Sequence, residues 1–180
     1  NSSTGVLTVS GTATLANYQT VLRTITFNST SEDPTVTNTN RTITWVVTDA
    51  NSDGVGAASS SGVTSTITIT PLSDVPVVTA GGTLSYTENG SAAAIDNTIT
   101  ISDPDDTHLS GATAAISSNF TTGDTLTLTT QNGISGTFNS STGVLTIGGT
   151  ASVANYQTAF RSITYYSNSE DPTAISSSRT

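Results

Sequence analysis

The sequence contains a long internal duplication. Residues 1–42, which begin NSSTGVLTVSGTATLANYQT, align without a gap on residues 139–180, and 27 of the 42 positions are identical. The offset from Asn1 to Asn139 is 138 residues. That period is too long for one turn of a solenoid and is close to the size of a globular domain. The duplication therefore predicts a tandem array, in which the back part of one repeat is followed by the front part of the next.

Composition excludes several classes of function. Thirteen Asp and Glu side chains against four Arg give a net charge of -9, and the chain has no Lys and no Cys. An acidic surface does not favour nucleic acid or anionic lipid, and no run of apolar residues is long enough to insert into a membrane. Without Cys there are no disulfides, thiolate metal sites or cysteine nucleophiles. Nucleic acid and direct membrane insertion are therefore not expected among the partners.

Period-two alternation of apolar and polar residues dominates the chain. Segments such as GVLTV, RTITF, RTITWVVTD, TSTITIT and DTLTLTT alternate in this way and end at Gly, Asn, Asp, Ser or Pro. TLANYQTVLRTI instead has apolar residues at three- and four-residue steps, with Thr14 available as an N-cap. We therefore expect an all-β fold of antiparallel sandwiches with one short helix per repeat, the second helix near residues 153–160.

Two prolines within ITPLSDVPVV mark the best domain boundary. Residues 1–72 are expected to form the C-terminal part of one repeat, 73–78 a short linker, and 79–180 the N-terminal part of the next. Strand edges left open by this phase invite pairing with another chain. The sequence leaves open whether each period holds two smaller sandwiches or whether neighbouring molecules complement one another.

An ordered set of motifs resembles cadherin-like extender repeats of giant bacterial RTX-type, type I-secreted surface adhesins. The motifs are STGVLT, RTITWVVTDANSDG, the LSDVP linker, SYTENG and ISDPDD, and ANYQxxxRxIT is similar to a segment of bacterial cadherin-like repeats. The resemblance implies tandem cadherin/Ig-like β-sandwiches and Ca²⁺ at the domain junctions. One departure is that TLANYQ stands where cadherins carry an acidic motif in mid-domain.

The acidic residues cluster in loops and lack protein counter-charges, and Ca²⁺ takes six to eight hard oxygen ligands. At the junction inside this chain, the linker would supply Asp74 and the preceding domain would supply Glu32 or Asp33. The loop of the next domain would supply Asp103, Asp105 and Asp106. By the family pattern, Asp49 would serve the junction before this segment and Glu88 the junction after it. The full set of predicted ligands is Asp74, Asp103, Asp105, Asp106, Glu32, Asp33, Asp49 and Glu88. The competing interpretation is that Asp residues form turns and caps, and it applies most strongly to Asp53, Asp96 and Asp124.

No arrangement in the sequence indicates an enzyme. His108 is the only histidine and is expected in an exposed loop, and no Gly-x-Ser-x-Gly turn exists. Trp45 is expected in a core or on a strand face. The resemblance implies a spacer on the bacterial cell surface that projects an adhesive tip for cell adhesion or biofilm formation, with neighbouring repeats as partners. The alternative is that the repeats themselves bind a glycan or a protein.

Overall fold

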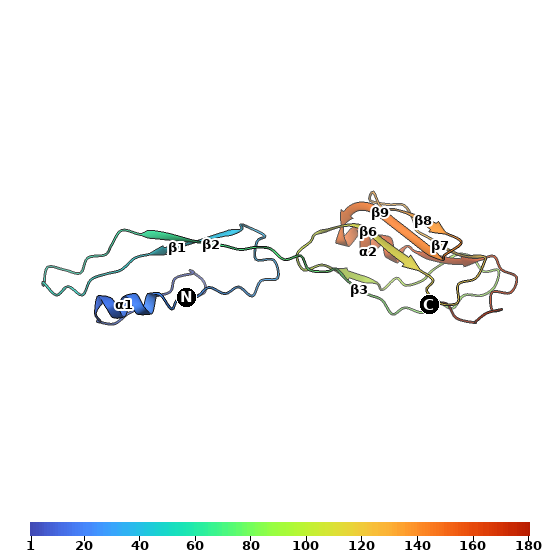
Figure 1. Cartoon of the computed structure of the whole chain (residues 1–180). Coiled ribbons are helices and arrows are strands. Elements are labelled where there is room, and N and C mark those ends of the chain that lie inside the picture. Colours follow the sequence, from blue (N-terminus) through green and yellow to red (C-terminus); the bar gives the residue numbers. More distant parts are fainter. The chain divides into compact units, whose positions relative to one another are not determined.

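The computed structural model describes all residues from Asn1 to Thr180 and divides them into two units, Asn1–Leu72 and Ser73–Thr180. The chain forms ten strands in several small sheets and two short helices, so it is β-rich as the alternation predicted (Figure 1). The second unit begins at Ser73. Its first strand, β3 (Val77–Thr79), starts inside the segment that was expected to be a linker.

The first unit consists of one helix and one β-hairpin. Helix α1 (Leu15–Leu22) begins after Thr14, whose hydroxyl accepts a hydrogen bond from the Asn17 N–H as an N-cap should. Strands β1 (Asn40–Trp45) and β2 (Val63–Thr68) pair antiparallel, and no other strand adjoins them. No residue of this unit is buried. The first unit therefore has no hydrophobic core of its own.

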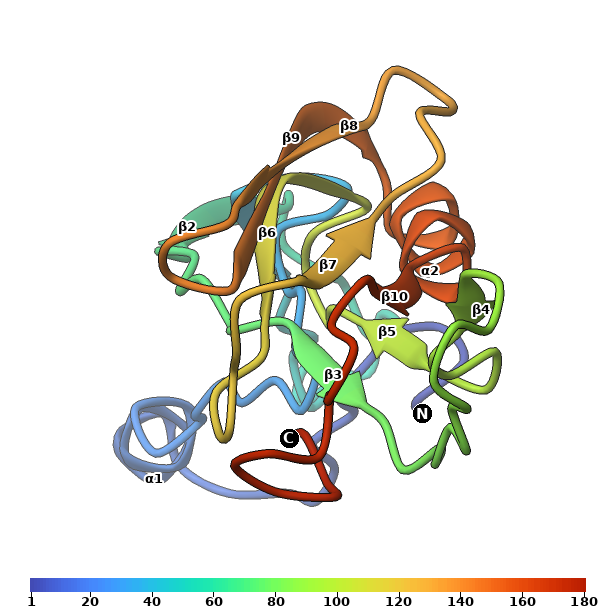
Figure 2. The ribbon, with the colours of Figure 1, turned by 90° about the vertical axis from the view of Figure 1, so that its right-hand side faces the viewer.

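The second unit has two three-stranded sheets and a two-stranded one. One sheet has the order β6 (His108–Ala115), β9 (Val144–Ser152), β8 (Ser135–Asn139). Another has the order β4 (Ala93–Ala94), β10 (Thr164–Ser167), β7 (Asp124–Thr127), and β3 pairs with β5 (Thr100–Ser102). Helix α2 (Val153–Arg161) follows β9 directly and packs against β5 and β9 (Figure 2). All pairings are antiparallel.

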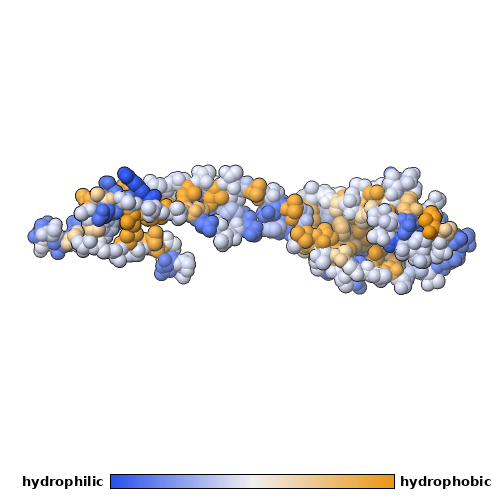
Figure 3. Space-filling model, turned by 60° about the horizontal axis from the view of Figure 1, so that its bottom comes forward, coloured by the Kyte–Doolittle hydropathy of each residue, from blue (hydrophilic) through white to orange (hydrophobic).

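All buried apolar side chains belong to the second unit. Leu145 and Ile147 from β9 pack with Leu126 from β7, and Tyr156, which is 0% exposed, enters the same core from α2. By contrast, large apolar residues of the first unit lie at its surface, where Leu15 is 85% exposed (Figure 3). The stability of this chain therefore resides mainly in the core of residues 73–180.

The two copies of the duplicated sequence adopt different structures. Helices form in both copies at the predicted positions. The predicted strands GVLTV and RTITF are wrong for the first copy, which has no strand at either segment, although the same segments of the second copy form β9 and β10. The reason is that β9 pairs with β6 and β8, and β10 with β4 and β7. These partner strands come from residues 93–139, and the first copy has no counterpart to them within this chain.

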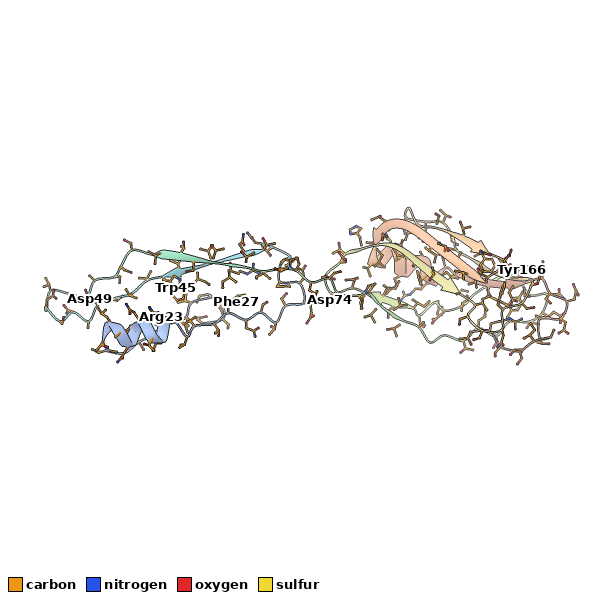
Figure 4. The ribbon with its side chains drawn as sticks, in the orientation of Figure 1. Arg23, Phe27, Trp45, Asp49, Asp74 and Tyr166 are labelled. Carbon is orange, nitrogen blue, oxygen red and sulfur yellow. The ribbon has the colours of Figure 1, made fainter.

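Two single residues can also be placed. His108 does not lie in a loop: it is the exposed first residue of β6, and its Nδ1 lies 2.9 Å from the Thr107 hydroxyl. Trp45 ends β1 as a half-buried strand residue, as predicted, and its indole N–H donates to the Ser65 hydroxyl on β2. In Figure 4, Trp45 and Arg23 lie between the hairpin and α1, where they line a shallow hollow.

Candidate metal site in the second unit

Three carboxylates meet in the loop between β5 and β6. Asp103, Asp105 and Asp106 each place an oxygen within 4.8 Å of the others. The loop folds around Asp103, whose Oδ1 accepts the backbone N–H groups of Asp105 at 3.3 Å and Asp106 at 2.9 Å. This is the Asx-turn geometry that Asp favours, and here it brings the three carboxylates close together.

The segment preceding β3 joins this cluster. Val77 pairs with Ser102 where β3 and β5 meet, which places residues just before Val77 beside residues just after Ser102. As a result the backbone N–H of Asp74 donates to Asp105 Oδ2 at 3.0 Å. The other carboxylate oxygen, Asp105 Oδ1, is buried and has no hydrogen-bond partner. A buried charged oxygen without a partner is costly, so this atom calls for a cation or another donor.

The same contacts shift the pKa values of Asp103 and Asp105 in opposite directions. Hydrogen bonding, foremost from the Asp106 N–H, lowers the pKa of Asp103 below its ordinary value. For Asp105, the hydrogen bond from the Asp74 N–H would lower the pKa, but burial and the neighbouring carboxylates of Asp103 and Asp106 together raise it. Where the three carboxylates meet, they therefore repel one another.

No arginine of the second unit neutralises the cluster. Arg161 donates through Nε to the carbonyl of Ile99, and Arg179 pairs with Asp124. The chain has no Lys. The charges at the loop are thus available to an external cation, and three carboxylates are the hard oxygen donors that Ca²⁺ prefers.

The structure brings together three of the eight predicted ligands and supplies the backbone of a fourth. The Asp74 side chain and Glu88 lie outside the group of three carboxylates. Asp33, Glu32 and Asp49 belong to the first unit. There Asp33 accepts from the Thr35 N–H and hydroxyl, and Asp49 accepts from the N–H groups of Asn51 and Ala58. Figure 4 labels Asp49 and Asp74 in their respective units.

Two buried carboxylates have structural roles. Asp96 accepts the N–H groups of Gly81 and Gly82 and both donors of Thr98, and these bonds, foremost that from Gly81, lower its pKa strongly. A Cβ on Gly82 would lie only 2.5 Å from the Asp96 side chain, so this approach requires glycine. The expectation that Asp96 makes turns instead of binding metal agrees with these contacts.

Asp124 does more than its predicted turn role. It is 2% exposed and accepts from Arg179 Nε at 2.6 Å, the Tyr165 hydroxyl at 2.6 Å and the Thr121 N–H at 3.1 Å. Burial alone would raise its pKa, but these three donors outweigh burial and lower it. Burial and the bond to Asp124 raise the pKa of Tyr165 to about 12. The only sequence signal for this network was the recurrence of an arginine as Arg41 and Arg179.

Comparison with known proteins gives one informative match. The chain is similar to halomucin from the haloarchaeon Haloquadratum walsbyi (strain DSM 16790 / HBSQ001), with 39% identity over 108 residues that cover 57% of this chain. The same stretch is 1% of halomucin. No protein-family model matches the chain, and no solved structure matches it. Neither helix has the length and apolar character needed to cross a bilayer.

Proposed function

We propose that this chain is a structural spacer segment of a large extracellular surface protein, built from tandem β-sandwich repeats that Ca²⁺ stiffens. The duplication with a 138-residue offset supports a repeated array, since a spacer gains reach with each added copy. The match to halomucin supports it as well, because 108 residues make up only 1% of that protein, which is therefore extremely long. In this proposal the chain has no enzymatic role.

The packing of the second unit favours a sandwich. Leu145 and Ile147 of the β6-β9-β8 sheet share one core with Leu126 and Tyr165 of the β4-β10-β7 sheet. Two sheets that bury their apolar faces against each other form the two layers of a sandwich. Helix α2 also contributes Tyr156 to this core.

The observation that carries the calcium part of the proposal is the unpartnered, buried Oδ1 of Asp105 among three carboxylates. The donor set fits a hard cation: Asp103, Asp105 and Asp106 offer up to six oxygens, and water or backbone carbonyls complete a shell of six to eight. An ion held there would tie the β5–β6 loop to the segment at Asp74, whose N–H already binds Asp105. Glu32, Asp33, Asp49 and Glu88 remain proposed ligands at junctions between repeats.

The test is the unfolding midpoint of the chain in millimolar Ca²⁺, in excess EDTA and in Mg²⁺. Extracellular calcium modules have Kd values of about 10⁻⁴ to 10⁻³ M, so a few millimolar Ca²⁺ should raise the midpoint of the second unit by about 5 °C. Mg²⁺ should have little effect, because it demands a tighter octahedral shell. Equal midpoints in Ca²⁺ and EDTA would rule out a metal role for this loop.

Asp105→Asn makes the test specific. Its amide can keep the bond from the Asp74 N–H and donate to Asp103, so the midpoint in EDTA should rise because the repulsion is relieved. The calcium response should disappear. Asp171→Asn is the matched control: it removes the same charge from an exposed turn, where Asp171 only accepts from the Thr173 hydroxyl. It should leave the calcium response intact.

A further inference from the structure

Strand β6 leaves one edge unpaired. It pairs with β9 along one side only, and it ends the order β6-β9-β8. An exposed edge offers a row of free N–H and C=O groups for another strand. Three independent features of the chain identify the strand that fits this edge.

The first feature is a β-bulge at the end of β6. The Ile116 N–H donates to the carbonyl of Gly143, which precedes β9. The backbone groups of the alternate residues, Ala115 and Ser117, therefore face the free edge. There the N–H groups of Ser117 and Ser118 both donate to the Thr180 carbonyl, and the Thr180 N–H donates to Ser118 at 3.4 Å. Thr180 thus begins an antiparallel pairing with the free edge of β6.

The second feature is the repeat itself. Thr180 corresponds to Thr42, which lies inside β1. In β1 the backbone N–H and C=O groups of the odd-numbered residues point toward β2. The bonds from the Ile69 N–H to the Thr39 carbonyl and from the Ser60 N–H to the Val47 carbonyl show this. The backbone groups of Thr42 and Thr44 therefore face away from β2. The side of β1 that is free is the same side that Thr180 uses to bind Ser118.

The third feature is the match of side chains. Continuing the pairing from Thr180 sets equivalents of Ile43, Trp45 and Val47 opposite Ile116, Ala114 and Ala112. Ile116, Ala114 and Ala112 belong to the core face of β6, and Ile43 and Trp45 are on the less exposed face of β1. The large side chains equivalent to Trp45 and Val47 face the small Ala114 and Ala112, as close packing requires, and the equivalent of Ile43 faces Ile116.

We propose that the free edge of β6 binds a β-hairpin with the sequence of β1–β2, carried on the same polypeptide as a continuation of the strand that Thr180 begins. The sheet then has the order β8-β9-β6 followed by two further strands. The folded domain therefore follows a phase of 138 residues that starts at Ser73 and runs through the second copy of the duplication. This inference does not depend on Ca²⁺ binding.

The experiment compares the 180-residue chain with an extended chain in which residues 43–72 are repeated after Thr180. Hydrogen exchange is measured by NMR at Thr113 and Ala115, whose N–H groups face the free edge. In the extended chain their exchange should slow by about tenfold or more, and the second unit should unfold at a higher temperature. Unchanged exchange at both residues would overturn the proposal.

A proline substitution provides the matched control. Thr44→Pro in the appended copy removes an N–H that faces β6 but no bond within the hairpin, and proline is tolerated where a strand edge faces solvent. It should abolish the slowed exchange if the hairpin docks. The same substitution in the original β1 should leave exchange at Thr113 and Ala115 unchanged, because that edge is unpaired.

A second source of the hairpin is distinguishable. If β1–β2 of another molecule bound β6, exchange at Thr113 and Ala115 in the original 180-residue chain would slow with rising protein concentration, and sedimentation would show a dimer. That result would overturn the assignment to the same polypeptide. A monomer with concentration-independent exchange, together with protection in the extended chain, is the expected result.

Discussion

The buried ion pair between Asp124 and Arg179 allows the sharpest test of how the two halves of the second unit are joined. Asp124 lies at the start of β7, whereas Arg179 follows β10 by twelve residues in the second copy of the duplication. The substitution Asp124→Asn keeps the shape of the side chain and removes its charge. It leaves the Arg179 guanidinium, whose side chain is 14% exposed, without a counter-charge.

The magnitude follows from the contacts. Asp124 accepts three hydrogen bonds, of which the two shortest come from Arg179 and Tyr165. Hydrogen bonds to a charged group contribute about 1.5–3 kcal/mol each, and breaking one side of a buried pair costs about 3–5 kcal/mol. We therefore expect Asp124→Asn to lower the free energy of unfolding of the second unit by about 3 kcal/mol. In a unit of roughly 100 residues that lowers the midpoint by about 10–20 °C.

The assay is urea unfolding followed by circular dichroism, with Trp45 fluorescence as a separate reporter of the first unit. Arg41 supplies the control. Arg41 and Arg179 bind equivalent loop carbonyls in the two copies. Arg41 binds those of Pro34 and Asn38, and Arg179 those of Pro172 and Ser176. Only Arg179 has an acidic partner. Arg179→Gln should cost at least as much as Asp124→Asn, because it also removes the bonds to Pro172 and Ser176, and the two effects should be non-additive. A loss below about 1 kcal/mol would refute the reasoning, since exposed pairs already contribute that much.

Three further predictions concern the whole chain. The folded protein lowers the pKa of Asp96 and Asp124, so both carboxylates stabilise the second unit fully above their unfolded pKa near 4. This stabilisation is lost as the pH falls toward the folded pKa values. In a series of thermal melts the unfolding midpoint should therefore drop between about pH 4 and pH 2. Tyr156→Phe should cost the second unit about 1–2 kcal/mol by leaving the Gly149 carbonyl without its 2.6 Å donor, whereas Tyr18→Phe should leave that unit's urea midpoint unchanged. Finally, because the net charge is -9, NaCl from about 0.05 to 1 M should raise the midpoint by screening repulsion, and a fall would contradict this.

Local features of the structure could be predicted from sequence. The spacing of apolar residues and the Thr14 cap located α1, and the short interval between Asp103, Asp105 and Asp106 was enough to predict that their carboxylates converge. Both depend on neighbours within a few residues. The alternation in RTITW and TSTIT also located β1 and β2 as strands, although residues 46–62 separate them and their pairing was not predicted.

Features that depend on distant partners could not be predicted. Nothing around Asp124 shows that Arg179, 55 residues later, neutralises it. Nor does GVLTV reveal whether it forms a strand: Leu7 is 66% exposed and outside any strand, while its equivalent Leu145 is 1% exposed in β9. β-propensity describes how a segment fits a pleated surface, and that surface is supplied by β6 and β8. A nearly identical sequence therefore forms this strand only where those partner strands precede it.

The contrast between the two copies also separates local from non-local stabilisation. In both copies the helical tyrosine donates to a glycine carbonyl seven residues earlier, and the last arginine binds loop carbonyls. Only the second copy has its helix tied to the strands of the preceding half, through Gln157, which accepts the Ile101 N–H, and Arg161, which donates to Ile99. The local geometry of the duplicated segment therefore forms without the segment equivalent to residues 73–138, whereas the bonds that hold its helix against that segment form only where it is present. If the chain belongs to a tandem array as proposed, mechanical strength should depend on the complete 138-residue phase, whose two halves the Asp124–Arg179 pair joins.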